Sequence, residues 1–525
     1  MTFSIILLVV FLAGMIAIGI WGMKKTATLN DFFLGGRSVG PWVSAFAYGT
    51  TYFSAVLFVG FGGAIGWGYG LKGLWIAFGN AIFGTLLAWF VLGRKTRTMT
   101  QRLDAMTMPE FLQERFGSKY IKMFAATIIF VFLVPYSAGV FKGLGYLFEA
   151  NFHITYDTAL LIMIAITGIY LILGGYFAVT LTDFIQGIIM IFGAILMVIV
   201  LTNKASEIAG TQGGITGGTT AANQAYQQWL SAIPAAKQPS MYYLGALVFM
   251  TSFGVWGMPQ MVQKFYAIKD ESVITKAAIL TTAFSIIIAF AAYYTGALSH
   301  VFFTNASIPM MADPTKGPNF DVVIPTLLTQ YLPEVLMGVI LLLILSASMS
   351  TLSSLVLVSA SSVAIDLYKG HINPKISKEA SLFMMRFLSA VFVALSYFVA
   401  KSKSELIVQL MALSWGAVAG AFAAPFFYGL YWKRATHSGI VAGMVSGVAV
   451  SIFLYYRTGE ALPLLKDFYA FCGPKMGPFS ASIGIFLPFI VVPVVSMFTK
   501  PVSKETLDRA FGSSAAHPAP QRVTV

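Results

Sequence analysis

Thirteen long apolar stretches constrain the fold of this chain more than any other feature. They cover approximately residues 3–22, 41–69, 73–93, 123–148, 158–175, 181–202, 241–263, 277–303, 323–365, 382–400, 406–432, 438–456 and 478–498. A helix needs about 20 apolar residues to cross the hydrocarbon core of a bilayer. Only 10% of the residues are charged, whereas soluble domains average about 25%. The sequence therefore predicts an all-α polytopic membrane protein with about 13 transmembrane helices in a lipid bilayer. It excludes a secreted disulfide scaffold, a cytosolic enzyme and a DNA-binding regulator.

The distribution of basic residues predicts the orientation of the chain. The first stretch has no basic residue before it and is followed by Lys24 and Lys25, as in an uncleaved span with the amino terminus outside. If the spans alternate from there, 23 of the 33 Lys and Arg residues are cytoplasmic, nine are external, and Lys142 lies within a span. The net charge of +13 is thus attributed to the positive-inside bias of a plasma-membrane protein, not to nucleic-acid binding, and the carboxyl terminus is predicted to be cytoplasmic.

Two connections are long. Residues 203–240, rich in Gly, Thr, Ala and Gln, are predicted to form an external loop with one amphipathic turn around Ala221–Leu230. Residues 500–525 are predicted to form a mostly disordered cytoplasmic tail. Since no second soluble domain is predicted, the function must reside within the membrane.

Two apolar stretches are interrupted by glycine and proline at corresponding positions of two possible five-helix halves. One interruption lies in Gly49–Gly63 and the other in Thr251–Gln260. Irregular backbone at membrane depth usually lines a cavity, and paired broken helices are typical of transporter binding sites. The alternative is that the glycines permit tight helix packing and that Pro259 makes a simple kink.

A serine-rich segment, Ser346–Ser354, lies within an otherwise apolar stretch. On a helix Ala347, Ser350, Thr351 and Ser354 share one face. Hydroxyls and freed carbonyls can hold a hard monovalent cation without the desolvation cost of several carboxylates. The alternative is that these small residues allow close helix approach, with the hydroxyls bonded to carbonyls of their own helix.

Two charged residues lie within or at the edge of apolar stretches. Asp183 opens the sixth stretch, and an acidic residue there indicates function unless it caps a helix or lies at the interface. Lys142 lies in the fourth stretch, where it could neutralise a substrate carboxylate or extend its ammonium to the interface.

Other kinds of site are not supported. The segment Gly35–Gly40 lacks the strand and the lysine of a phosphate-binding loop. The five histidines have no metal-ligand spacing. An intramembrane enzyme would need a catalytic pair at depth, and only Asp183 is a candidate. The sequence thus predicts a secondary transporter and no enzyme, with a channel or a transporter-like sensor as alternatives of another class.

Four segments give the chain a resemblance to a known family. They are DFFLGGRSVGPWVSAFAYGT (Asp31–Thr50), GGYFAVTLTDFIQG (Gly174–Gly187), MSTLSSLVLVSASSVAIDLYK (Met349–Lys369) and, more weakly, GMPQMVQKF (Gly257–Phe265). In content and order these resemble the sodium/solute symporter family, which includes bacterial sodium/proline, sodium/sialic acid and sodium/galactose symporters. The likeness runs from about residue 3 to residue 435.

The resemblance implies a leucine-transporter-type fold with two inverted five-helix repeats. The expected division is a leading helix and cytoplasmic loop (1–40), a first repeat (41–202), an external loop (203–240), a second repeat (241–432), two trailing helices (433–499) and the tail (500–525).

The resemblance also implies Na⁺ as the coupling ion and suggests its ligands. The first sodium site would use the carbonyls of Thr50, Phe53 and Ala347 and the hydroxyls of Ser350 and Thr351. A second site, present in some family members, would use Asp183, Ser350, Ser353 and Ser354.

The resemblance to the family identifies the substrate-binding residues less clearly than the sodium ligands. Tyr136 matches an aromatic residue that contacts substrate in the proline symporters, but Tyr52 stands where those symporters carry an Asp. The expected pocket lining is Leu57, Phe58, Tyr136, Lys142, Phe253 and Trp256. Such a pocket suits a small organic solute, an amino acid or monocarboxylate, better than a sugar or sialic acid, which stays the alternative. The sequence does not predict an oligomeric state.

Overall fold

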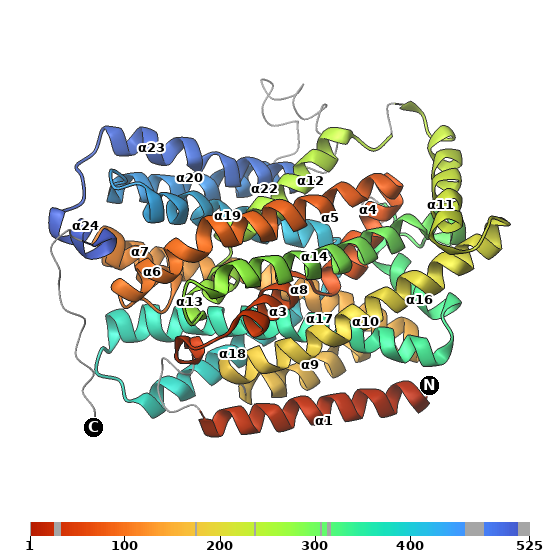
Figure 1. The fold of residues 1–525 in the computed structure, drawn as a ribbon, viewed down its shortest axis with the longest axis horizontal. Helices are drawn as coiled ribbons and strands as arrows, with labels where there is room; N and C mark the ends of the chain where they lie inside the picture. The colour runs from red at the N-terminus through yellow and green to blue at the C-terminus, as the bar shows by residue number, and fades with distance from the viewer. Residues whose placement is uncertain are drawn as a thin grey trace.

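The computed structural model describes residues 2–25, 33–173, 176–235, 238–304, 307–311, 317–456 and 477–512. Helices that lie side by side make up most of this part of the chain (Figure 1). Two isolated bridges, Val39 with Ile268 and Met310 with Pro318, are its only β pairings. The predicted all-α class is therefore confirmed for the described residues.

The elements follow the predicted apolar stretches closely. Those of the first half are α1 (Thr2–Lys25), η1 (Gly35–Arg37), α3 (Pro41–Tyr52), η2 (Val56–Phe61), α4 (Gly62–Tyr69), η3 (Gly70–Gly73), α5 (Leu74–Gly79), η4 (Asn80–Leu87), η5 (Trp89–Gly93), α6 (Arg94–Arg102), α7 (Met108–Phe116), α8 (Lys119–Phe152), α9 (Tyr156–Leu173), α10 (Tyr176–Ala209) and α11 (Gly214–Ser231). Those of the second half are α12 (Met241–Gly254), η7 (Val255–Gly257), α13 (Pro259–Ala267), α14 (Val273–Ala297), α15 (Ser299–Phe302), η10 (Phe320–Val322), α16 (Val323–Tyr331), α17 (Glu334–Ser361), η11 (Ser362–Ile372), α18 (Lys378–Lys401), α19 (Ile407–Tyr431), α20 (His437–Tyr456), α22 (Gly477–Phe486), α23 (Pro488–Met497) and α24 (Lys504–Phe511).

Ten helices in the described part are long and apolar enough to cross a membrane, and a bent pair brings the number to eleven. The pair is Met241–Gly257 with Pro259–Ala267, which meet at 48°. The continuous run Val56–Arg102 counts as one span of 47 residues, and Tyr156–Ile166 is a shorter apolar helix. A multi-pass membrane protein is therefore confirmed, while the number thirteen stays a prediction.

Both predicted interruptions are present. Helix α3 ends at Tyr52, and Phe53 is extended with φ −114° and ψ 125° before the chain resumes in η2. In the second half α12 ends at Gly254, and Met258 is extended with φ −83° and ψ 116° before α13. Because a helix leaves its last four carbonyls without intrahelical partners, each break frees backbone oxygens inside the bundle.

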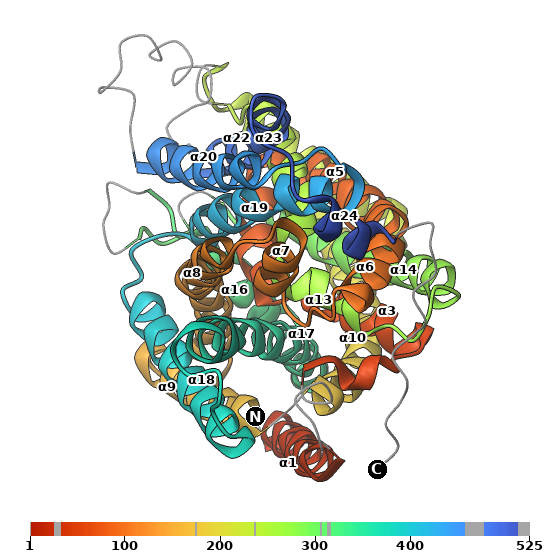
Figure 2. The same cartoon turned by 90° about the vertical axis from the view of Figure 1, so that its left-hand side faces the viewer.

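The helices form a layered bundle when viewed along their length (Figure 2). In this view α1, α9 and α18 lie on one side, α20, α22 and α23 lie on the other, and α8, α13 and α17 lie between them. The serine-rich helix α17 and the α13 half of the second broken helix are thus in the interior of the protein.

Glycine allows α4, which follows the break in the first broken helix, to touch α14 directly. A Cβ atom at Gly66 of α4 would collide with the backbone of Gly296, and a Cβ atom at Gly296 would collide with the carbonyl of Gly62. These backbones therefore pack against each other with no side chain between them.

Two connections are more ordered than predicted. Helix α11 extends over 18 residues where a single amphipathic turn was expected. The predicted disordered tail includes α24, which Ser503 caps by accepting a hydrogen bond from the Thr506 amide. Arg102 of α6 donates to the Phe511 carbonyl at 2.8 Å, so α24 is tied back to the bundle. Residues 513–525 of the tail lie outside the described part.

Candidate functional site

A cluster of oxygen atoms joins the end of α3 to the middle of α17. The Ser350 hydroxyl lies 3.0 Å from the Thr50 carbonyl, and the Thr351 hydroxyl lies 3.3 Å from it. The Thr351 hydroxyl also lies 3.1 Å from the Thr51 carbonyl. Both hydroxyls also reach the Ala347 carbonyl, at 3.0 and 3.1 Å.

These oxygens outnumber the protons available to bridge them. Each hydroxyl has one proton to donate, yet Ser350 has three carbonyl oxygens within 3.1 Å and Thr351 has three within 3.3 Å. Ser350 and Thr351 are fully buried. The arrangement therefore concentrates partial negative charge at one buried point, as a bare monovalent cation requires.

Four of the five residues predicted for the first sodium site meet here, namely Thr50, Ala347, Ser350 and Thr351. The fifth, Phe53, is the extended residue directly after α3, and its amide donates to the Gly49 carbonyl at 3.3 Å. The Thr51 carbonyl, which was not predicted, also faces this cluster.

A second polar cluster adjoins the first. The Lys264 ammonium of α13 lies 3.4 Å from Asp183 Oδ2 of α10 and donates to the Ser354 hydroxyl at 3.0 Å. The Ser354 hydroxyl also lies 3.1 Å from that of Thr51. Ser353 donates to the Ser350 carbonyl at 2.9 Å. The residues predicted for a second sodium site thus lie near Lys264, which directly follows the predicted apolar stretch 241–263.

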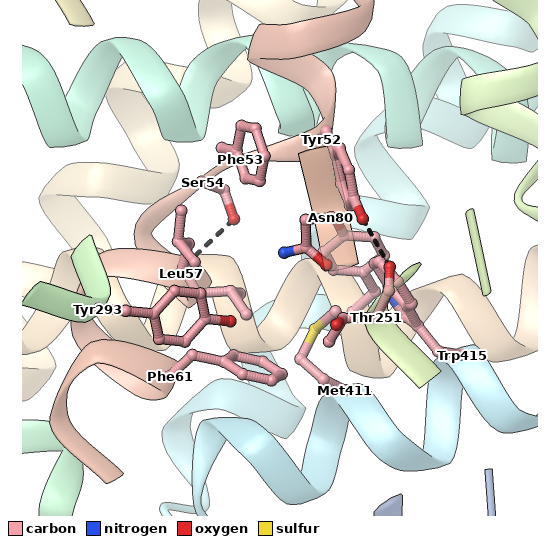
Figure 3. A pocket seen from close by; sticks show the side chains of 12 residues that line it. Tyr52, Phe53, Ser54, Leu57, Phe61, Asn80, Thr251, Tyr293, Met411 and Trp415 are labelled. Carbon is pink, nitrogen blue, oxygen red and sulfur yellow. Dashed lines mark hydrogen bonds between the residues drawn. The ribbon is translucent and has the colours of Figure 1, made fainter. Parts of the chain in front are cut away.

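A cavity lies beside the break in the first broken helix (Figure 3). Its lining comes from the break and from seven helical elements, namely α3, η2, η4, α8, α12, α14 and α19. The lining residues are Tyr52, Phe53, Ser54, Val56, Leu57, Phe61, Asn80, Tyr136, Thr251, Tyr293, Met411 and Trp415. None of these lining residues is charged.

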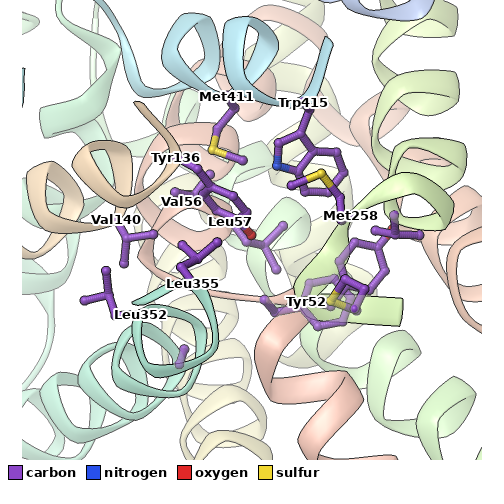
Figure 4. Close-up of a cluster of buried hydrophobic side chains, with 14 of the residues drawn as sticks. Tyr52, Val56, Leu57, Tyr136, Val140, Met258, Leu352, Leu355, Met411 and Trp415 are labelled. Atoms are coloured by element: carbon purple, nitrogen blue, oxygen red, sulfur yellow. The ribbon is translucent and has the colours of Figure 1, made fainter. Parts of the chain in front are cut away.

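The residues with polar side-chain groups in the lining are Tyr52, Ser54, Asn80, Tyr136, Thr251, Tyr293 and Trp415. Tyr52 is engaged, because its hydroxyl donates to the Thr251 carbonyl at 2.6 Å. The indole Nε1 of Trp415 is buried and has no hydrogen-bond partner among the described residues. Several lining residues also belong to a buried apolar cluster that includes Leu352 and Leu355 (Figure 4). The cavity therefore combines apolar surface with several convergent polar groups, as small-molecule sites do.

Two of the six residues predicted to contact substrate line this cavity, Leu57 and Tyr136. The other four lie elsewhere. Phe58 is buried in the core, Phe253 stacks on Phe83 with centroids 5.2 Å apart, and Trp256 donates to the Phe83 carbonyl at 3.0 Å.

Lys142 is fully buried and pairs with Asp321 of η10. Its Nζ lies 3.0 Å from Asp321 Oδ2, and it also donates to the Glu405 carbonyl. Asp321 accepts from the Ile407 amide at the start of α19, at 3.1 Å. The ammonium therefore does not line the cavity, and it connects α8 to η10 and α19.

Several residues that line the cavity were not predicted, although the sequence around some of them contains a pattern that could have indicated their role. Asn80 is a buried polar residue within an apolar stretch, which is itself an indication of function. Met411 and Trp415 are four residues apart and so share a face of α19. Tyr293 carried no comparable signal in the sequence.

Comparison with known proteins identifies the family. The family described as the sodium:solute symporter family matches residues 32–447. The chain belongs to this family. The sodium/proline symporter of Haemophilus influenzae is 31% identical over 512 residues, which cover 97% of each chain. The osmoregulated proline transporter of Bacillus subtilis is 30% identical over 513 residues, again with 97% of each chain covered.

Solved structures of transporters share the fold of this symporter. A substrate-bound, outward-open sodium-coupled sialic acid symporter aligns with a TM-score of 0.72 at 18% identity, covering 96% of this chain and 99% of that one. A closed conformation of Mhp1, a nucleobase-cation-symport-1 family transporter, aligns with a TM-score of 0.52 at 12% identity, covering 93% and 99%. The protein is thus a sodium-coupled, multi-pass symporter for a small organic solute, as the sequence predicted.

Proposed function

We propose that this symporter imports a zwitterionic amino acid, with proline as the first candidate, together with sodium. The observation that carries the proposal is a cavity whose lining residues include no charged side chain. A zwitterion has no net charge for the protein to neutralise, whereas an anion would call for a cation in the lining. The free indole N–H of Trp415 can donate to a carboxylate, and the apolar lining suits a hydrocarbon ring. The sodium/proline symporters among the relatives support the same choice.

Sodium is proposed to bind first, between α3 and α17. Its ligands would be the carbonyls of Thr50, Phe53 and Ala347 and the hydroxyls of Ser350 and Thr351. Phe53 and Ser54 also line the cavity, so an ion that fixes the break would order one wall of the solute site. A second ion is proposed beside Asp183, with Ser350, Ser353 and Ser354.

The finer architecture proposed is thirteen spans, in two inverted five-helix repeats (41–202 and 241–432) flanked by one leading and two trailing helices. The breaks after Tyr52 and Gly254, at the start of each half, support the repeats. The start of α1 lies at the opposite end of the bundle from α6, α7 and α24, which supports an external amino terminus (Figure 1). The basic residues of α6 accord with a cytoplasmic location for that end.

Alternating access would couple the two gradients by rocking one helix bundle against the other. One charge that moves inward across 100 mV contributes about 2.3 kcal/mol, and a tenfold sodium gradient adds about 1.4 kcal/mol. One sodium could therefore sustain roughly a 500-fold gradient of a neutral solute, and two could sustain roughly 10⁵-fold. The stoichiometry thus sets how far the solute accumulates.

Reconstitution into liposomes tests the function. With an inward sodium gradient, we expect saturable uptake of labelled proline that collapses when sodium is replaced by choline. A panel of other amino acids, monocarboxylates and sugars, added as competitors, defines the solute. Competition by acidic or basic solutes, or by sugars in preference to proline, would contradict the proposal.

The cavity predicts the effect of removing one hydrogen-bond donor. Trp415→Phe keeps an aromatic ring but loses the indole N–H, and a hydrogen bond to a charged group is worth about 1.5–3 kcal/mol. We expect the solute KM to rise at least tenfold in liposome uptake assays. Trp89→Phe is the matched control, because Trp89 is also buried with an unpartnered indole but does not line the cavity. Equal effects of the two substitutions would argue against Trp415 as a solute ligand.

A further inference from the structure

The strongest unassigned feature is the buried lysine beside the proposed second sodium site. Lys264 is 2% exposed and Asp183 is completely buried. Lys264 Nζ lies 3.4 Å from Asp183 Oδ2 and 3.0 Å from the Ser354 hydroxyl. Asp183 and Ser354 are two of the four residues predicted to bind the second sodium. The ammonium therefore contacts oxygens that the ion would need.

A sodium ion and the Lys264 ammonium cannot both be stabilised beside the single carboxylate of Asp183. A buried carboxylate is stable only when paired with a positive charge or with several hydrogen-bond donors. Asp183 carries one negative charge, and its Oδ1 has no hydrogen-bond partner among the described residues. One positive charge balances the site, whereas sodium and Lys264 together would leave an excess charge in a medium of low dielectric constant. The two cations should therefore exclude each other.

The ammonium is also linked to the first oxygen cluster. The Ser354 hydroxyl lies within hydrogen-bond distance of both Lys264 and the Thr51 hydroxyl, at 3.0 and 3.1 Å. The Thr51 carbonyl in turn accepts from Thr351 at 3.1 Å. Lys264 itself belongs to α13, the segment that follows the break in the second broken helix. Movement of this side chain therefore alters the surroundings of both proposed ions and of one half of a broken helix.

We propose that Lys264 is a tethered competitor of sodium, which holds the oxygens of Asp183 and Ser354 until a second sodium ion displaces its ammonium. This inference rests on the proposed function and concerns how its second ion is regulated. Lys264 lowers the affinity of the second site for sodium. Because Lys264 belongs to α13, its displacement by sodium changes the contacts that α13 makes with α10 and α17.

The test is binding of ²²Na⁺ to the purified protein in detergent, without solute, over a range of sodium concentrations. For the intact protein we expect two phases, of which the weaker is the Asp183 site. Lys264→Met removes the competing charge and keeps the side-chain length, so the half-saturating concentration of the weaker phase should fall at least tenfold. Lys264→Arg retains the charge, so both phases should stay. Asp183→Asn added to Lys264→Met should abolish the weaker phase.

Lys122→Met is the matched control. Lys122 is likewise buried and pairs with a buried carboxylate, Asp366, at 3.4 Å, but it contacts neither proposed site. We expect its ²²Na⁺ binding to match that of the intact protein. If Lys264→Met does not yield monodisperse protein, Lys264→Gln carries the same expectation, because its amide can still donate to Asp183.

Two failures can be told apart. Unchanged or weaker sodium binding in folded Lys264→Met or Lys264→Gln, with sodium-driven uptake intact in the unmodified protein, would overturn the competition alone. Absence of sodium-driven uptake in the unmodified protein would overturn the proposed function. A stoichiometry that is the same in Asp183→Asn and in the unmodified protein would show that Asp183 binds no transported ion, which would also overturn the competition.

Discussion

Replacing Thr351 by alanine, or Ser350 by alanine, should raise the sodium concentration for half-maximal uptake by roughly ten- to hundredfold. Each change removes one hydroxyl oxygen from the cluster that faces the Thr50 carbonyl. A polar contact to a charged group contributes about 1.5–3 kcal/mol, which corresponds to that range. The measurement is initial uptake in liposomes at fixed solute and varied sodium, with sodium replaced by choline.

Ser389→Ala is the control for this pair. Ser389 is buried in α18 and its hydroxyl donates to the Met385 carbonyl of its own helix, so its loss should leave the sodium dependence unchanged. The ligand assignment would be refuted if both Thr351→Ala and Ser350→Ala inserted normally and kept the sodium dependence of the intact protein.

Lys142→Met should lower the stability of the protein by about 3–5 kcal/mol, because removal of one partner leaves a buried charge uncompensated. The pair with Asp321 is completely buried and connects α8, η10 and the start of α19. Thermal unfolding in detergent should show a large fall in Tm for Lys142→Met. The double variant with Asp321→Asn should recover much of it, since no unpaired charge remains.

This experiment also separates two roles for Lys142. If Lys142 bound the solute carboxylate, its loss would raise the solute KM while Tm changed little. We expect instead that Tm falls while the solute KM changes little. Lys72→Met, which changes an exposed lysine, is the control and should alter neither quantity. A double variant less stable than either single one would contradict the ion-pair argument.

The features that depend on local sequence were predicted well. Apolar stretches located the spans, and the glycines near Tyr52 and Gly254 located both breaks. The serine-rich segment placed Ser350 and Thr351 on one face because residues three and four apart on a helix are neighbours. Helix α24 was missed, although Ser503 is a residue type that caps helices.

The features that the sequence did not predict depend on contacts between residues that are distant in the chain. Lys264 and Asp183 are 81 positions apart, and Lys264 directly follows the predicted apolar stretch 241–263, so no local pattern joins the two residues. Lys142 lies near the end of a long helix, where an extended ammonium is common, and only the folded chain brings Asp321 against it. The cavity draws Asn80, Tyr293 and Trp415 from three helices, and a single sequence has no local pattern that joins them.

The contact of Gly66 with Gly296 defines the smallest unit that can move when the carrier changes shape. Two backbones that touch without intervening side chains cannot slide far without collision, so α4 and α14 must travel as one rigid body. The compliant point is then the extended stretch at Phe53 and Ser54, between α3 and η2. A reporter pair across α4 and α14 should keep a constant separation throughout the transport cycle, while a pair across Phe53 should not.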